Sequence, residues 1–134
     1  MKKMTRVVKA VLIVAALFLI RPLMAQEDAI PFQLVEEKPV FMDGAANAFS
    51  QWVNQHLVYP EIAKKNGIQG RVTLQFTVET DGSVTHVKVL RGLDPSLDEE
   101  AVRVVSGSPK WKPGKHRDRC VRVTYTHPVI FQIR

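Results

Sequence analysis

The chain has 134 residues and a formal net charge of +6 at pH 7, and hydrophobic residues make up 46% of it. Five of the 19 Lys and Arg residues precede position 26, which leaves 14 basic residues against 13 acidic ones in the remainder, a net charge of about +1. General nucleic-acid binding depends on a strongly basic face, so the charge balance after position 25 argues against that class of function.

The amino terminus has the layout of a secretory signal peptide. Four basic residues within the first nine precede the apolar residues 10–20, and Arg21 ends that run. A membrane-spanning helix needs about 20 apolar residues, and this run has 11. We expect export and cleavage after Ala25, although Leu23 is bulkier than the residue usual three positions before a cleavage point. The alternative is a short uncleaved anchor.

The residue types needed for catalysis or metal binding are not grouped in the sequence. The four His residues stand far apart, with no zinc-binding spacing, and His116 with Cys120 gives only two of the four ligands of a structural zinc site. Cys120 is the only cysteine, so no internal disulfide can form. We therefore expect no enzyme, no metal and no cofactor.

The segment after the signal begins with an extended leader, residues 26–44, which mixes prolines, acids and scattered apolar residues. Apolar residues at helical spacing then predict a helix over 45–57 with one buried stripe. A short helix should start at Pro60 and end at Gly67. We expect this second helix to bury Ile62 and Ala63.

Period-two alternation predicts a half-buried strand over 71–78, whose inward residues are Val72, Leu74, Phe76 and Val78. Asp81-Gly82 supplies a hairpin turn into a second strand over 84–90, with a change of phase near Thr85. A helix from about 97 to Gly107 follows, with Asp94-Pro95-Ser96 at its start and a capping box from Ser96 to Glu99. Its acidic first turns suit the helix dipole.

The last predicted element is a long strand over 121–133, reached through a basic loop, residues 108–119. The strand places His127 inward as a core histidine, and Pro128 predicts a bend or an edge position. In the loop, Trp111 is expected to anchor the core. The six basic residues between 110 and 122 are read as a solvated run that would also suit an acidic partner. The elements together predict an α+β fold with helices packed on one face of an antiparallel sheet.

Taken in order, residues 59–90 (YPEIAKKNGIQGRVTLQFTVETDGSVTHVKVL), 97–105 (LDEEAVRVV) and 111–114 (WKPG), with the alternating last strand, resemble the TonB C-terminal domain. The resemblance runs from about Phe49 to Ile133. It implies a two-layer domain over 45–134 whose three-stranded antiparallel sheet has strand 71–78 in the middle. The last strand then has a free edge.

In that family the free edge captures a short extended peptide, the TonB box, of an outer-membrane receptor, which is β-augmentation. The resemblance therefore implies a periplasmic binding module in TonB-dependent transport, with the backbone of 119–127 as the binding element. The expected partner-binding residues are Arg119, Val121, Arg122, Val123, Thr124, Tyr125, Thr126 and His127.

Several alternatives remain open at this point. The edge strand can be blunted by Pro128 and its arginines and bind nothing, or it can pair with a second copy, which would make the protein a scaffolding homodimer. An inner-membrane motor of the ExbB–ExbD type is a further expected partner if the anchor is retained. A leader of about 20 residues reaches at most ~70 Å, which argues against force transduction across a periplasm.

Overall fold

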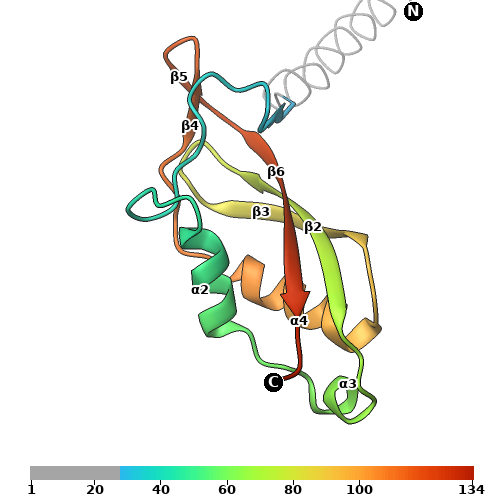
Figure 1. The fold of residues 1–134 in the computed structure, drawn as a ribbon. Helices are drawn as coiled ribbons and strands as arrows, with labels where there is room; N and C mark the ends of the chain where they lie inside the picture. The colour runs from blue at the N-terminus through green and yellow to red at the C-terminus, as the bar shows by residue number, and fades with distance from the viewer. Residues whose placement is uncertain (1–27) are drawn as a thin grey trace, which may run out of the picture.

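The computed structural model describes residues 28–134, which form an α+β fold (Figure 1). The signal sequence and its cleavage site lie outside the described residues. The helices are α2 (Ala48–His56), α3 (Glu61–Lys65) and α4 (Pro95–Ser106). The strands are β1 (Ile30–Pro31), β2 (Gly70–Val78), β3 (Val84–Arg91), β4 (Gly114–His116), β5 (Arg119–Val121) and β6 (Val123–Phe131). Within residues 28–134 no helix has the length and apolar character needed to cross a bilayer.

The main sheet has the strand order β1-β6-β2-β3, so β2 lies between β3 and β6 as expected. All four inward residues of β2 are fully buried, because its alternation places one face against the helices. β6 pairs with β2 antiparallel from Gly70 opposite Phe131 to Val78 opposite Val123. The register continues without a shift past Pro128.

The expected number of three strands is wrong by one, because the leader contributes β1. β1 pairs in parallel with the start of β6, with Ile30 opposite Val123. The leader then turns and pairs with β4, where the Glu37 N–H donates to the Lys115 carbonyl and the Lys115 N–H returns the bond, both at 2.9 Å. Val35 and Phe41 are buried, so the leader is packed onto the domain along most of its length.

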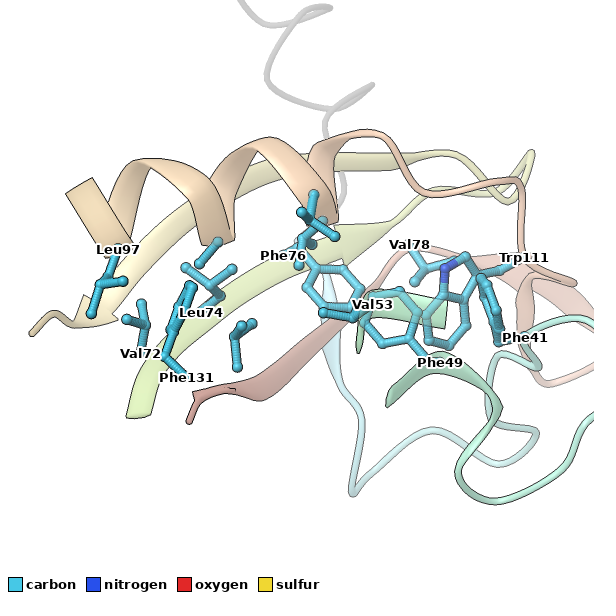
Figure 2. Close-up of a cluster of buried hydrophobic side chains, with 14 of the residues drawn as sticks. Phe41, Phe49, Val53, Val72, Leu74, Phe76, Val78, Leu97, Trp111 and Phe131 are labelled. Carbon is cyan, nitrogen blue, oxygen red and sulfur yellow. The ribbon is translucent and has the colours of Figure 1, made fainter. Parts of the chain in front are cut away.

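The core lies between the sheet and the helices, and Figure 2 shows that it changes character along its length. Leu97 of α4 packs with Val72, Leu74 and Phe131 at one end. At the other end Trp111 and rings from α2, β2 and the leader form an aromatic cluster. The centroids of Phe49 and Trp111 are 4.9 Å apart, which confirms that Trp111 anchors the core.

The β2–β3 hairpin and α4 are confirmed with local differences. Gly82 has a φ of +87° in the turn, and the expected phase change in β3 is a bulge at His86, which has a φ of +52°. Asp94 caps α4 by accepting from the Ser96 N–H at 3.0 Å, with Pro95 in the first turn. The predicted capping box from Ser96 is therefore wrong, since the cap lies two residues earlier.

Two other local expectations are wrong: the burial of Ile62, and the irregular loop over residues 108–119. Ile62 is 64% exposed, whereas its neighbour Ala63 is fully buried. α3 has only five residues, and its single turn presents one position to the core. The basic loop contains the β4–β5 hairpin, whose two-residue turn, Arg117-Asp118, has φ values of +53° and +60°. Left-handed φ at both positions matches the twist of the flanking strands.

Candidate functional site

The outer edge of β6 is the candidate site, and alternate residues of the strand direct their backbone groups toward it. The Ile30 N–H donates to the Arg122 carbonyl at 2.8 Å, and the Phe32 N–H donates to the Thr124 carbonyl at 2.9 Å. Because backbone groups alternate between the two sides of a strand, Thr126, Pro128 and Ile130 face the same edge as Thr124.

This edge is divided into two halves. β1 covers the first half, up to Thr124, and among residues 28–134 no strand pairs with the second half. We call the stretch from Thr126 to Ile130 the open half-edge. Its N–H donors belong to Thr126 and Ile130, since Pro128 has none. Pro128 is tolerated in β6 because its missing N–H lies on this outer side, where the pairing with β2 does not need it.

Seven of the eight expected partner-binding residues fall into three groups, and Arg122 stands apart from them. Arg119 and Val121 lie in β5 and pair with β4, so they are separate from the edge of β6. Val123, Tyr125 and His127 direct their side chains to the helix-covered face, where Val123 and His127 are buried. Thr124 and Thr126 lie on the opposite face, and the backbone of Thr124 is already engaged by the leader. The expectation of a free edge throughout 119–127 is therefore wrong for its first part.

Arg122 stands between β5 and β6 and is held by the turn of the β2–β3 hairpin. Its Nε donates to both carboxylate oxygens of Glu79, at 2.7 and 2.9 Å. The Thr85 hydroxyl donates to the same carboxylate at 3.2 Å. The ion pair is half-buried, and it fixes the start of β6 relative to β2.

Burial shifts the pKa values of two side chains of β6. Burial lowers the pKa of His127 to about 4, and its ring lies 4.9 Å from that of Phe49. His127 is 6% exposed, which confirms a core position. Burial also raises the pKa of the Tyr125 hydroxyl above its ordinary value. The Tyr125 ring meets Phe32 of the leader edge-on at 4.6 Å.

A groove of about 470 Å³ lies at the far end of the open half-edge, where Ile130 lines it. The end of α2 contributes Asn54 and Gln55 to its wall, and Leu57 and Tyr59 follow from the connection to α3. Ile130, which is 54% exposed, and Phe131 form the strand side. A smaller cavity, about 170 Å³, lies beside the covered half between Phe32 and the aromatic cluster.

Sequence reasoning missed Phe32 and the groove residues of α2. A signal for α2 was present, because Asn54 and Gln55 lie on the polar side of the predicted helix. The sequence did not indicate a contact for Phe32, because an aromatic residue next to Pro31 in a segment without periodicity predicts no particular partner. In the described part of the chain, no group of three or more His, Cys, Asp or Glu side chains is arranged to hold a metal ion. Cys120 is exposed on β5.

The model of a known protein family, Gram-negative bacterial TonB protein C-terminal, matches residues 55–133, more than half of the chain. The chain belongs to the TonB C-terminal family. The matched range contains β2, β3, α4 and β6, so both the sheet centre and the candidate edge fall within it. The TonB C-terminal α+β fold expected from the sequence is confirmed.

Protein TonB of Pseudomonas aeruginosa is 29% identical over 76 residues, which are 57% of this chain and 22% of that protein. The match thus spans about a fifth of the relative's length. The solution structure of the Helicobacter pylori TonB C-terminal domain has 24% identity and a TM-score of 0.49, and covers 63% of this chain and 89% of that one. The solution structure of the Pseudomonas aeruginosa TonB C-terminal domain has 24% identity and a TM-score of 0.47, and covers 81% of this chain and 97% of that one.

Proposed function

We propose that this domain binds extended partner peptides of the TonB-box type by β-augmentation along the outer edge of β6. The observation that carries the proposal is the open half-edge from Thr126 to Ile130, whose last residue, Ile130, lines a groove of about 470 Å³. An unpaired edge exposes backbone donors and acceptors that an added strand satisfies, and the adjacent groove receives the side chains of that strand.

The affinity of such a complex comes from the backbone and its selectivity from the groove. Each backbone hydrogen bond contributes about 0.5–1.5 kcal/mol net, and only Thr126 and Ile130 supply donors. The partner strand gains further free energy by covering Ile130 and Leu57. Asn54 and Gln55 offer amide groups to polar side chains of the peptide.

The expected partner is a receptor of the outer membrane, and the expected place of action is the periplasm. An ExbB–ExbD-type motor in the inner membrane acts on the domain only if the amino-terminal segment is retained. With the leader packed from Ile30 onward, the eight residues between Arg21 and Ile30 reach about 30 Å. This reach favours a secreted binding module over a direct transducer. Sequencing the mature amino terminus tests this point, because a start at Gln26 removes the anchor.

A second candidate function is a scaffold that self-associates through the same open half-edge, since an exposed edge also pairs with a second copy. Sedimentation over a range of concentrations separates the two functions. A stable dimer that excludes peptide favours the scaffold, whereas a monomer that binds peptide favours the binding module.

The test of the proposed function uses two substitutions at Thr126, whose N–H faces outward. Thr126→Pro removes this donor without removing a hydrogen bond to β2, and Thr126→Val keeps it. Calorimetric titration with a synthetic TonB-box peptide should show at least about a tenfold loss of affinity for Thr126→Pro, the equivalent of about 1.4 kcal/mol. Thr126→Val should bind as the wild type does. Equal binding by both variants, or no wild-type binding at millimolar peptide, contradicts the proposal.

A further inference from the structure

The first part of the leader, residues 28–34, lies on the edge of β6 in the position that an added peptide strand would take (Figure 1). The Ile30 and Phe32 N–H groups donate to the carbonyls of Arg122 and Thr124 on this edge. The residue between them, Pro31, has no N–H, and in this register its backbone faces away from β6. An extended peptide with N–H donors two positions apart matches this alternation.

The side chains of this segment show what the edge accepts. Phe32 is half-buried and meets the Tyr125 ring edge-on at 4.6 Å, an arrangement that aromatic pairs favour. It also lines the cavity of about 170 Å³ that Trp111 and Phe41 close from the core side. Leu34, two residues later, is 69% exposed. Ile30, two positions before Phe32, is also partly buried. The recognition element is therefore an aromatic residue two positions after an apolar one.

The segment is held more weakly than the leader that follows it. Val35 is 3% exposed and Phe41 is 4% exposed, and the pairing of Glu37 with Lys115 fixes this second part to β4. By contrast, residues 28–34 pair with β6 over only two residues, Ile30 and Pro31, and end in a turn in which the Leu34 N–H donates to the Pro31 carbonyl at 2.9 Å. The segment can leave β6 while the core and the second part of the leader stay in place.

We propose that residues 28–34 are a built-in ligand that covers the first half of the β6 edge, and that partner peptides with an aromatic residue two positions after an apolar one displace it. This inference rests on the proposed function, because it extends the same peptide-binding edge. A tethered segment competes at an effective concentration on the order of millimolar. A partner peptide must therefore bind tightly enough to displace the leader, and weak or unrelated peptides do not.

The test uses the chain as purified from the cell envelope and two leader variants. Phe32→Ala removes the ring that packs on Tyr125, and Leu34→Ala is the matched control, since its side chain is exposed. Neither substitution touches Val35 or Phe41, so the unfolding temperature should stay close to that of the wild type. The first probe is a labelled synthetic peptide with the sequence of residues 27–34, and a second probe carries Ala in place of its Phe.

The Phe32→Ala variant should bind the first probe about tenfold more tightly than the wild type or Leu34→Ala, as expected if the internal strand is in place about nine-tenths of the time. The second probe should bind weakly to all three proteins. Equal affinity of the first probe for all three, or no binding to Phe32→Ala, overturns the inference. So does a concentration-dependent dimer lost in Phe32→Ala, because it places the segment on a second copy.

A TonB-box peptide separates this inference from the proposed function. Tighter binding of that peptide to Phe32→Ala than to Leu34→Ala supports both. If it binds through Thr126 and Ile130 while the leader probe binds all three proteins equally, the proposed function stands and the built-in ligand is overturned. If it binds none of them while the leader probe binds Phe32→Ala, the edge accepts strands of the leader type and the proposed function fails.

Discussion

The backbones of Gly82 and Trp111 are in direct contact. The Trp111 N–H donates to the Gly82 carbonyl at 2.8 Å, and a Cβ atom built at Gly82 would lie 1.9 Å from the Trp111 carbonyl oxygen. This contact joins the β2–β3 turn to the loop that carries the core tryptophan. It also lies beside the start of β6, where Glu79 holds Arg122.

Gly82→Ala should destabilise the fold strongly, because the new methyl group meets a backbone atom and the position has a φ of +87°. We expect a loss of more than about 2 kcal/mol in the free energy of unfolding, measured by urea denaturation. Gly67→Ala is the matched control. Its φ is +64° but no atom lies within 4 Å of the added Cβ, so it should cost about 1 kcal/mol. Equal losses would mean that the contact with Trp111 contributes nothing.

Phe49→Ala should cost about 3–5 kcal/mol, since the ring is buried against Phe76, Trp111 and His127. Ile62→Ala should change the free energy of unfolding by less than about 1 kcal/mol, because that side chain is largely exposed. Denaturant melts of both variants check this difference. A large loss for Ile62→Ala would contradict its exposed position.

Glu100→Gln should lower stability at neutral pH by about 1 kcal/mol. Glu100 accepts the Val58 N–H at 2.5 Å and pairs with Arg103. Burial raises the pKa of Glu100, but the hydrogen bonds from Arg103 and Val58 outweigh it, and the net pKa lies below the ordinary value of 4.5.

Because the folded-state pKa of Glu100 is depressed, its stabilisation is present above pH 4.5 and is lost as the pH falls through the folded pKa. The difference between wild type and Glu100→Gln should therefore shrink in acid, as measured by urea midpoints from pH 7 to 3. Glu99→Gln, on the exposed side of α4, should match the wild type within about 0.5 kcal/mol. A difference that stays constant with pH would rule out the ion pair as its cause.

His127 should make the fold sensitive to mild acid. Its folded pKa of about 4 lies below the ordinary value of 6.5, so between these values the unfolded chain binds the proton and the folded chain does not. Stability then falls from pH 6.5 to 4, by up to about 3 kcal/mol, and levels off below. His127→Leu should flatten this part of the profile, whereas the exposed His56→Gln should not. An NMR titration midpoint of the His127 ring near 6.5 would contradict the prediction.

The alternation of β2 and the apolar stripes of α2 and α4 were sufficient to predict the sheet centre and the core. These elements bury one face, and a buried face leaves a period in the sequence. Ile62 was misplaced because a five-residue helix has no period, and adjacent residues of one turn point in different directions. Ala63 takes the buried position.

The candidate edge was only partly predictable. Its location on the last strand followed from the family resemblance, but the leader that covers its first half has no regular pattern. Ile30 and Phe32 pair through their backbones, and backbone pairing depends on which edge is free rather than on side-chain type. The turn at Arg117 and Asp118 was missed for a related reason, because left-handed turn positions are usually marked by Gly or Asn.

The central claim is that a partner strand adds to the open half-edge of β6. Amide hydrogen exchange, followed by NMR with and without a synthetic TonB-box peptide, tests it most directly. The account predicts that the peptide slows exchange of the Thr126 and Ile130 amides and leaves the outer edge of β3, the other end of the sheet, unchanged. Protection that appears on β3, or that leaves Thr126 and Ile130 unaffected while the peptide is bound, would contradict it.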